Sequence, residues 1–212
     1  MASSPEAAKA QRHLSRRDPK MRQLIRQVGP FGLRPQRGGY RMLVRAILSQ
    51  QISVAAARTI RGRLQAKLPG GRFVPAAVNA LSDQQLQAAG VSAQKRTYLR
   101  DLTERTMDGR LSFRHMSRLD DEAIITELTQ VKGIGRWTAQ MFLLFSLGRP
   151  DVFAPDDLGI RNAMIRIYEL DSDVQRTILE ELAECWRPHR SVASWYLWRA
   201  LDQDIASTQY PV

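Results

Sequence analysis

The sequence predicts an all-α fold, and three observations support this prediction. Apolar residues recur at the spacing that places them on one face of a helix. Residues that cap helix N-termini, such as Ser53 and Ser82, precede these segments, and glycine or proline follows them. No segment alternates apolar and polar residues over enough positions to predict a strand. We therefore expect about ten helices and no sheet.

Local signals set the limits of each expected helix. Asp18-Pro19 is a good helix start, because an N-cap is followed by proline in the first turn. Ser82 and Gln85 form a capping box, and Gly148 ends an apolar segment. Residues 1–17 show no apolar periodicity, so we expect a flexible basic tail there. The expected helices cover about 18–28, 40–49, 53–68, 82–90, 92–108, 120–130, 136–147, 157–170, 172–186 and 190–202.

The charge of the chain points to a polyanionic partner. Lysine and arginine total 32 against 21 acidic residues, which gives a net charge of +11. Residues 1–45 hold eleven basic side chains and only two acidic ones, Glu6 and Asp18. A field of this size favours nucleic acid, although a solubilising surface or a protein that lies near the ribosome would also explain it.

Several protein classes are excluded by the composition. No apolar run approaches the roughly 20 residues that span a membrane, and the N-terminus lacks a secretory signal. Cys185 is the single cysteine, so neither an internal disulfide nor a four-cysteine iron–sulfur cluster can form. We expect Cys185 in the core. We also expect an intracellular protein, cytoplasmic on chromosomal DNA if bacterial and nuclear if eukaryotic.

A glycine-rich turn between two expected helices is the most informative local feature. It comprises Val131, Lys132, Gly133, Ile134 and Gly135. The backbone N–H groups at the start of the following helix can bind a phosphate, and Lys132 adds charge beside them. Ile134 is expected to anchor the turn in the core. A turn of this kind is also common as a simple helix cap.

Three longer stretches resemble a known family. They are VKGIGRWTAQMFLLFSLGRPDVFAPDDLGI at 131–160, LVRAILSQQISVAAA at 43–57 and RPHRSVASWYLWRALD at 187–202. Together they resemble the helix-hairpin-helix DNA glycosylases, in particular the 3-methyladenine DNA glycosylase II type, over about residues 20–203. The resemblance implies two helical lobes with the active-site cleft between them.

The expected domain organisation follows from that resemblance. A core of residues 18–212 would contain one lobe at about 40–150, with the hairpin at 121–147. The second lobe would combine about 18–39 with 151–212. Longer relatives carry an N-terminal β-rich domain, and we expect this domain to be absent because the family core begins near residue 20.

The resemblance assigns catalysis to Asp157, the second aspartate of the pair at 156–157. An ionised carboxylate stabilises the oxocarbenium-like sugar that forms when a glycosidic bond breaks. The alternative role of Asp157 is that of a helix N-cap, and one residue can serve both roles. An alkylated purine is already cationic and leaves readily, and no Glu or His lies between Val131 and Asp157 to act as a general acid.

The remaining site residues are also implied by the resemblance. A flipped base would enter an aromatic pocket, and Gln51 would fill the gap that it leaves, while Gln50 contacts DNA or supports the structure. The hairpin carbonyls would hold a monovalent cation that bridges to a DNA phosphate, and no other cofactor is expected. The expected pocket residues are Trp137, Met141 and Trp198, the DNA-binding residues Gln50, Gln51, Lys132, Gly133, Ile134, Gly135 and Arg136, and the cation ligands the carbonyls of Thr129, Val131 and Ile134.

Together these features indicate a monofunctional enzyme that releases alkylated purines from double-stranded DNA. Relatives that also nick the strand carry a lysine where this chain has Trp137. We expect a monomer with no membrane partner. Two alternatives stay open: a non-catalytic helix-hairpin-helix protein that binds damaged DNA, and a glycosylase for another lesion such as an oxidised purine, a mismatched base or uracil.

Overall fold

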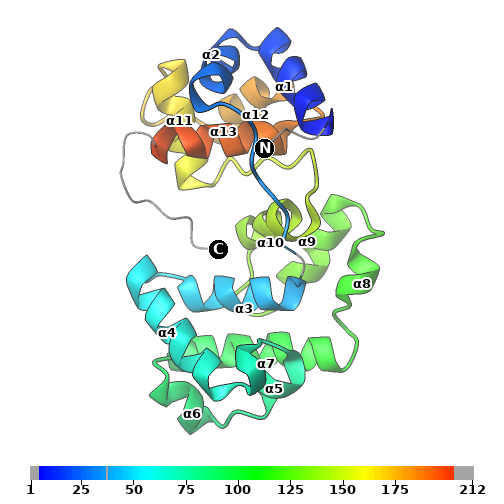
Figure 1. The fold of residues 1–212 in the computed structure, drawn as a ribbon, viewed down its shortest axis with the longest axis vertical. Helices are drawn as coiled ribbons and strands as arrows, with labels where there is room; N and C mark the ends of the chain where they lie inside the picture. Colours follow the sequence, from blue (N-terminus) through cyan, green and yellow to red (C-terminus); the bar gives the residue numbers. More distant parts are fainter. Residues whose placement is uncertain (1–4, 37, 203–212) are drawn as a thin grey trace. The chain divides into compact units, whose positions relative to one another are not determined.

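The computed structural model describes residues 5–36 and 38–202, and this part of the chain is helical without any strand (Figure 1). The predicted all-α fold is confirmed. No helix among these residues has the length and apolar character needed to cross a membrane. The elements are α1 (Pro5–Arg17), α2 (Pro19–Val28), α3 (Gly39–Ser49), α4 (Val54–Lys67), the 3-10 turn η1 (Pro69–Gly71), α5 (Pro75–Asn79), α6 (Asp83–Ala88), α7 (Ala93–Met107), α8 (Phe113–Met116), α9 (Asp121–Thr129), α10 (Arg136–Phe142), the π-helical turn η2 (Leu143–Leu147), α11 (Leu158–Tyr168), α12 (Arg176–Glu184) and α13 (Arg190–Asp202).

The chain divides into two compact units, each with its own core. The terminal unit contains the described residues up to Pro35 and those from Leu143 onward, and the central unit contains those from Gln36 to Phe142. The boundaries lie after residues 35 and 142, whereas the sequence suggested about 39 and 150. The π-helical turn therefore belongs to a different unit from α10, although the two were expected to form one helix over 136–147.

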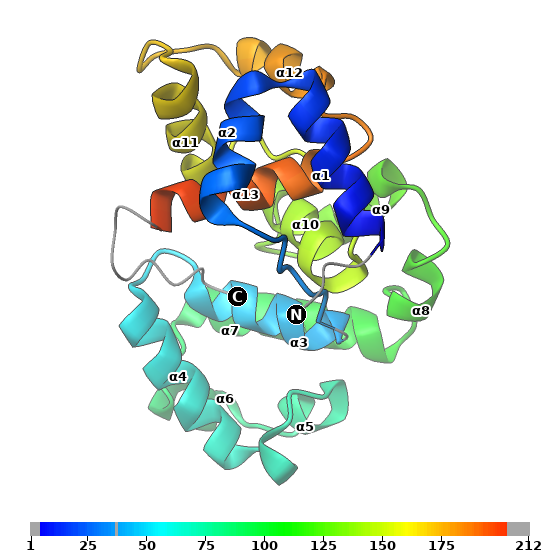
Figure 2. The same ribbon diagram turned by 45° about the horizontal axis from the view of Figure 1, so that its top comes forward.

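Helix α13 is the centre of the terminal unit. It packs against α1, α2 and α11, and these helices lie next to it in both ribbon views (Figures 1 and 2). Asp18 strengthens this arrangement at the start of α2, where it caps Met21 through Oδ1 and accepts a hydrogen bond from Trp186 Nε1 through Oδ2 at 2.7 Å. A buried carboxylate needs such donors, because leaving it without partners costs free energy.

Helix α1 corrects the expectation of a flexible tail over residues 1–17. Ala7, Ala10 and Leu14 are buried on one face of α1 and lie against the rest of the terminal unit. Gln11 on the same helix donates a hydrogen bond to the hydroxyl of Tyr196 at 2.6 Å. The apolar stripe is built mainly from alanines and lies among arginines, so its helical spacing is easy to overlook. Residues 1–4 of the expected tail lie outside the described residues.

The central unit is built around α3 and α7. Helix α3 packs against α4, α7 and α10, while α5 and α6 cover α7. The buried face of α3 includes Leu43, Val44, Ile47 and Leu48, all fully enclosed. This face explains why a strongly apolar helix with two arginines folds here.

Most expected helix starts are confirmed by side-chain caps. Ser53, Ser82, Ser92, Asp120 and Asp157 each accept a hydrogen bond from a backbone N–H in the first turn of the following helix. The expected capping box is present, because Gln85 also accepts from the backbone N–H of Ser82. Each cap satisfies an otherwise unpaired helix-terminal donor, which is worth about 1 kcal/mol.

Other expectations were wrong in detail. The short helices α5 and α8 were missed because they are too brief to show periodicity. Cys185 is exposed rather than in the core, since it lies at the C-terminal end of α12. The helix expected from about 172 starts only at Arg176.

Candidate active site and DNA-binding hairpin

Asp157 stands where a loop becomes helix α11. Its Oδ1 accepts the backbone N–H of Ile160 at 2.8 Å, so it is the N-cap of that helix. The same oxygen accepts the indole N–H of Trp198 at 2.8 Å. Only 8% of Asp157 is exposed. The carboxylate is therefore oriented by the helix end and by a tryptophan, and the capping and catalytic roles of Asp157 are compatible.

Trp198 is held on two sides. Its ring stacks on Phe145 with centroids 5.6 Å apart, and its edge reaches Asp157. Gly159 lies under this contact, because a Cβ at that position would approach Trp198 Cδ1 to 3.0 Å and Asp157 Oδ1 to 3.1 Å. Sequence reasoning missed Phe145 and Gly159. The glycine in the first turn of α11 was the available signal, since glycine inside a helix is costly unless close packing requires it.

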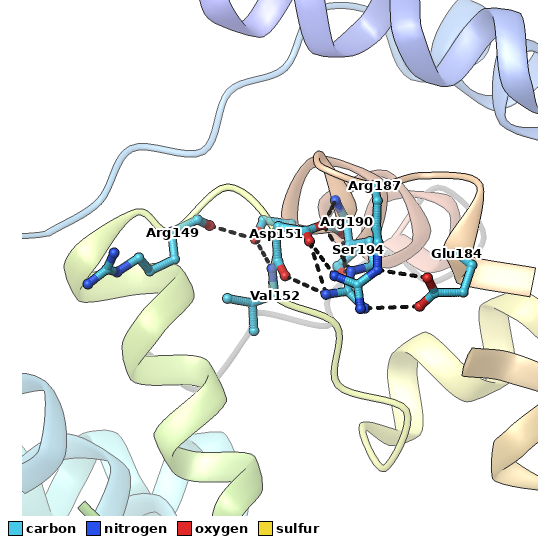
Figure 3. A network of polar contacts seen from close by, with 8 residues as sticks. Arg149, Asp151, Val152, Glu184, Arg187, Arg190 and Ser194 are labelled. Atoms are coloured by element: carbon cyan, nitrogen blue, oxygen red, sulfur yellow. Dashed lines mark hydrogen bonds and ion pairs between the residues drawn. The ribbon is translucent and has the colours of Figure 1, made fainter. Parts of the chain in front are cut away.

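A network of ion pairs fixes the loop that leads to Asp157. Asp151 accepts Arg190 Nε at 2.9 Å and Arg187 Nη1 at 2.9 Å, and the main-chain oxygen of Asp151 accepts Arg190 Nη2 at 3.0 Å. Figure 3 shows Asp151 facing both guanidinium groups, with Glu184 beside them. Arg187 also donates to Glu184 at 2.8 Å.

Ser191 adds a second tie between the same segments. Its hydroxyl donates to the carbonyl of Arg149 at 2.6 Å and accepts the N–H of Val152 at 2.9 Å. The loop before Asp157 is thus anchored to the start of α13, the helix that carries Trp198. The hydrogen bond between Asp157 and Trp198 depends on the positions of this loop and of α13. We therefore regard Asp151 and Arg190, which join the two, as positioning residues. They were not identified from the sequence.

Asp156, the neighbour of the expected catalytic residue, has a different environment. It is exposed and forms an ion pair with Arg176 at 3.0 Å. Exposed pairs of this kind contribute at most about 1 kcal/mol. Asp156 is therefore a surface residue beside the site.

The glycine-rich turn lies between α9 and α10 of the central unit and is supported from three sides. Gly133 has a φ of 79° and packs so tightly on Tyr98 that a Cβ would lie 2.1 Å from the ring. Its carbonyl accepts the side chain of Gln50 at 2.7 Å. The N–H of Lys132 donates to Asp101 Oδ2 at 2.8 Å. Ile134 is buried, as expected for an anchor.

These contacts refine the expected phosphate site. The N–H of Lys132 donates to Asp101, so it is not available to a phosphate. The backbone N–H groups that could bind a phosphate therefore lie later in the turn. Gly135 is exposed, and a Cβ there would meet nothing within 4 Å. The side chain of Lys132 is exposed, whereas that of Arg136 forms an ion pair with Glu122 at 2.9 Å. Asp101 and Tyr98, which sequence reasoning missed, lie on α7 and could not be connected to the turn without the fold.

Gln50 and Gln51 follow α3 and have different surroundings. Gln50 supports the hairpin through the hydrogen bond described above, and its contact with DNA stays a prediction. Gln51 is exposed and has a φ of 55°, a left-handed conformation that is uncommon for a residue with a side chain. Such strain is frequent at functional turns, and it is consistent with an exposed side chain that contacts a ligand.

The three expected pocket residues belong to different units. Trp137 lies at the start of α10 with 39% of its surface exposed, although its helix was expected to be apolar nearly all round. Met141, one turn later, is buried in the same unit. Trp198 belongs to the terminal unit and is 3% exposed. The common pocket stays a prediction.

The chain is similar to known proteins in both sequence and structure. Residues 44–188 match the model of the HhH-GPD superfamily base excision DNA repair protein. The chain is 36% identical to DNA-3-methyladenine glycosylase 1 of Schizosaccharomyces pombe, over 90% of this chain and 86% of that protein. Among solved structures, a 3-methyladenine DNA glycosylase of the same yeast in complex with abasic DNA matches with a TM-score of 0.82 and 35% identity, over 95% of this chain and 100% of the other.

A bacterial structure gives the same result. The DNA-3-methyladenine glycosidase of Bacillus halodurans matches with a TM-score of 0.84 and 32% identity, over 94% of this chain and 91% of that chain. The similarity therefore spans most of the chain, and the family model includes the hairpin and the loop before α11. This chain belongs to the HhH-GPD superfamily of base excision DNA repair proteins, and it is a DNA glycosylase of that family.

Proposed function

We propose that the protein hydrolyses the N-glycosidic bond of alkylated purines such as 3-methyladenine and 7-methylguanine in double-stranded DNA. The observation that carries this proposal is the buried Asp157 carboxylate, oriented by Trp198 and by the N-terminus of α11. The relatives named as 3-methyladenine glycosylases support the substrate class. An enzyme with this substrate works inside the cell, where chromosomal DNA lies.

The reaction breaks the bond between C1′ of the deoxyribose and the base nitrogen. The base leaves with the electron pair of that bond, and the sugar becomes oxocarbenium-like. Asp157 stabilises this positive charge and orients the water whose oxygen bonds to C1′. The proton released by that water passes to the carboxylate or to solvent. An abasic site and a free base result.

An alkylated purine fits this arrangement because it carries a positive charge before the bond breaks. Its departure neutralises that charge, so protonation by a general acid adds little. No Glu or His lies between Val131 and Asp157. Trp137 presents an exposed aromatic ring, and an electron-rich ring favours a cationic base.

The strand should remain intact after the base is released. Strand cleavage by β-elimination in this superfamily needs an amine that forms a Schiff base with the sugar. Trp137 occupies the sequence position of that amine and supplies none. Hydrolysis alone is expected from this chain.

The target base must leave the helical stack before Asp157 can act on its sugar. The hairpin turn would hold a DNA phosphate through the N–H groups around Gly135 and the side chain of Lys132. Gln51 would enter the space that the extruded base leaves. Its exposed, left-handed position at the end of α3 supports this role.

A monovalent cation would complete the hairpin when DNA is bound. Its ligands would be the main-chain carbonyls of Thr129, Val131 and Ile134, which are hard oxygen donors. The carbonyl of Val131 accepts the N–H of Ile134 at 3.0 Å, and a carbonyl has a second lone pair for a cation. The cation would supply positive charge next to the phosphate.

A panel of lesions tests the proposal. Duplex DNA treated with a methylating agent is incubated with the full chain, and released bases are separated by chromatography. We expect 3-methyladenine or 7-methylguanine in the supernatant and alkali-labile sites in a strand that is otherwise intact. Duplexes with uracil, 8-oxoguanine or a mismatch serve as comparison substrates. Release from one of these alone would move the proposal to another lesion class, and strand breaks without alkali would contradict hydrolysis.

A further inference from the structure

Helices α3 and α4 form the most one-sided charged surface of the central unit. Residues 39–67, which span both helices, contain six basic side chains and no acidic one. The two helices pack against each other. Arg41 and Arg45 are four residues apart and therefore lie on the same face of α3. Like charges at this spacing destabilise a helix slightly.

Arg45 is the most unusual residue of this surface. Its Nε is buried and has no hydrogen-bond partner among the described residues. Burial lowers the pKa of Arg45, and the nearby charges of Arg41 and Arg61 lower it further. Neither Arg45 nor Arg61 has a carboxylate partner among the side chains that the structure describes.

This lack of partners is local. Other arginines of the central unit form ion pairs: Arg100 with Asp83 at 3.0 Å, Arg105 with Asp101 at 3.1 Å and Arg110 with Glu104 at 2.9 Å. Arg45 and Arg61 differ from these three arginines, because neither is paired with a carboxylate among the described side chains. The guanidinium of Arg45 is half-buried, lies near the charges of Arg41 and Arg61 and has no carboxylate partner of its own, and these are features of a site for an external anion.

We propose that Arg41, Arg45 and Arg61 bind a backbone phosphate of the DNA duplex, at a second phosphate site separate from the hairpin turn. The proposal rests on DNA being the substrate. Arginine suits this role because its planar guanidinium can contact two phosphate oxygens at once. The phosphate would also screen the three positive charges from one another.

The second site lies on the same unit as the hairpin. Gln50, which follows α3, donates its hydrogen bond to Gly133 of the hairpin. Arg45 precedes Gln50 by five residues, which is roughly 8 Å along a helix axis. Gln51 follows directly. One duplex can therefore contact the hairpin and the arginines, with the turn that carries Gln51 between the two contacts.

The test compares three single substitutions that each remove one positive charge. Arg45→Gln and Arg61→Gln alter the proposed site. Arg63→Gln is the matched control, because Arg63 lies exposed on the same helix as Arg61 and is not among the charges that act on Arg45. The full chain is titrated with a duplex that carries a tetrahydrofuran abasic analogue, at several salt concentrations. This probe cannot be turned over, so binding is measured without chemistry.

We expect Arg45→Gln and Arg61→Gln to weaken binding about fivefold to tenfold and to reduce the slope of log K against log salt by about 0.9, the value for one phosphate contact. Arg63→Gln should change the slope much less. Thermal unfolding supplies a second measurement. Arg45→Gln should not lower the Tm, because it removes a cation that its neighbours repel.

Two results would overturn the proposal. Equal effects of all three substitutions would show a diffuse field rather than a site. Unchanged binding, or a Tm of Arg45→Gln several degrees below that of the wild type, would show that Arg45 has a structural role only. Base release from methylated DNA is measured separately on the wild type. If the wild type releases no base but Arg45→Gln still weakens binding, the proposed function fails while the phosphate site stands.

Discussion

The indole N–H of Trp198 donates a hydrogen bond to Oδ1 of Asp157 at 2.8 Å, across 41 residues of sequence. The same oxygen accepts the N–H of Ile160, so one carboxylate oxygen is fixed by two donors from two helices. Fixed donors of this kind keep a charged group in place without reorganisation during the reaction. The contact assigns Trp198 a role in orienting Asp157.

Trp198→Phe tests this role. Phenylalanine keeps an aromatic ring against Phe145 but removes the N–H donor. A hydrogen bond to a charged group is worth about 1.5–3 kcal/mol, so we expect single-turnover base release to slow by about 10- to 100-fold. Binding to abasic-analogue DNA should change little. Trp195→Phe on the same helix is the control and should retain the wild-type rate; equal rates for Trp198→Phe and the wild type would contradict the role.

Substitutions at the two hairpin glycines should distinguish an effect on folding stability from an effect on DNA affinity. Gly133→Ala places a Cβ against the ring of Tyr98 at a φ of 79°, so both the Tm and DNA affinity should fall. Gly135→Ala adds a methyl group in open space, so the Tm should stay near the wild-type value. DNA affinity should still fall if a phosphate approaches the backbone there. Unchanged affinity for Gly135→Ala would place the phosphate elsewhere.

The contact between Asp151 and Arg190 should contribute more to stability than an exposed ion pair. Arg190→Gln removes the guanidinium that contacts both oxygens of the Asp151 carboxylate. Both side chains are largely buried, with 22% of Asp151 and 15% of Arg190 exposed. We expect a loss of about 1–3 kcal/mol in the free energy of unfolding, or a Tm decrease of roughly 2–4 °C per kcal/mol. Arg176→Gln breaks the exposed pair with Asp156 and should cost less than about 1 kcal/mol. Similar losses in the two variants would show that the network adds no special stability.

His189 should make the terminal unit less stable in acid. Burial lowers its pKa below the usual 6.5, and the charges of His13 and Lys9 lower it further while Asp151 opposes them. The unfolded chain therefore binds a proton more readily, and stability should fall as the pH drops below about 6.5. Thermal unfolding at pH 7.5, 6.5 and 5.5 measures this. His189→Gln should show a weaker decrease than the wild type, whereas His115→Gln, at an exposed position, should match the wild type.

Much of the fold was predictable because its signals are local. Ser53, Ser82 and Asp120 cap helices within three residues of their own positions, and apolar spacing marks the longer helices. Helix α1 was missed because alanines form much of its buried face, and α5 and α8 are too short for a periodic pattern. Burial of a small residue depends on what packs against it, which a single helix cannot show.

The site was predictable to a lesser degree. Asp157 and the glycine-rich turn were identified from their sequence context. The partners that hold them were not, because Trp198 is 41 residues from Asp157 and Asp101 is 31 residues from Lys132. Asp151 and Arg190, 39 residues apart, show no pattern that would connect them before folding. Long-range polar contacts of this kind become apparent only in the folded chain.

The most direct test of the central claim compares Asp157→Asn with Asp156→Asn in single-turnover release of 3-methyladenine from methylated duplex DNA. Asparagine is an equally good N-cap, so neither variant should lose its fold, and the Tm of each checks this. We expect Asp157→Asn to slow release by at least about 100-fold while it still binds abasic-analogue DNA, and Asp156→Asn to keep the wild-type rate. Release at the wild-type rate by Asp157→Asn would contradict the account, because the carboxylate would then have no part in the reaction.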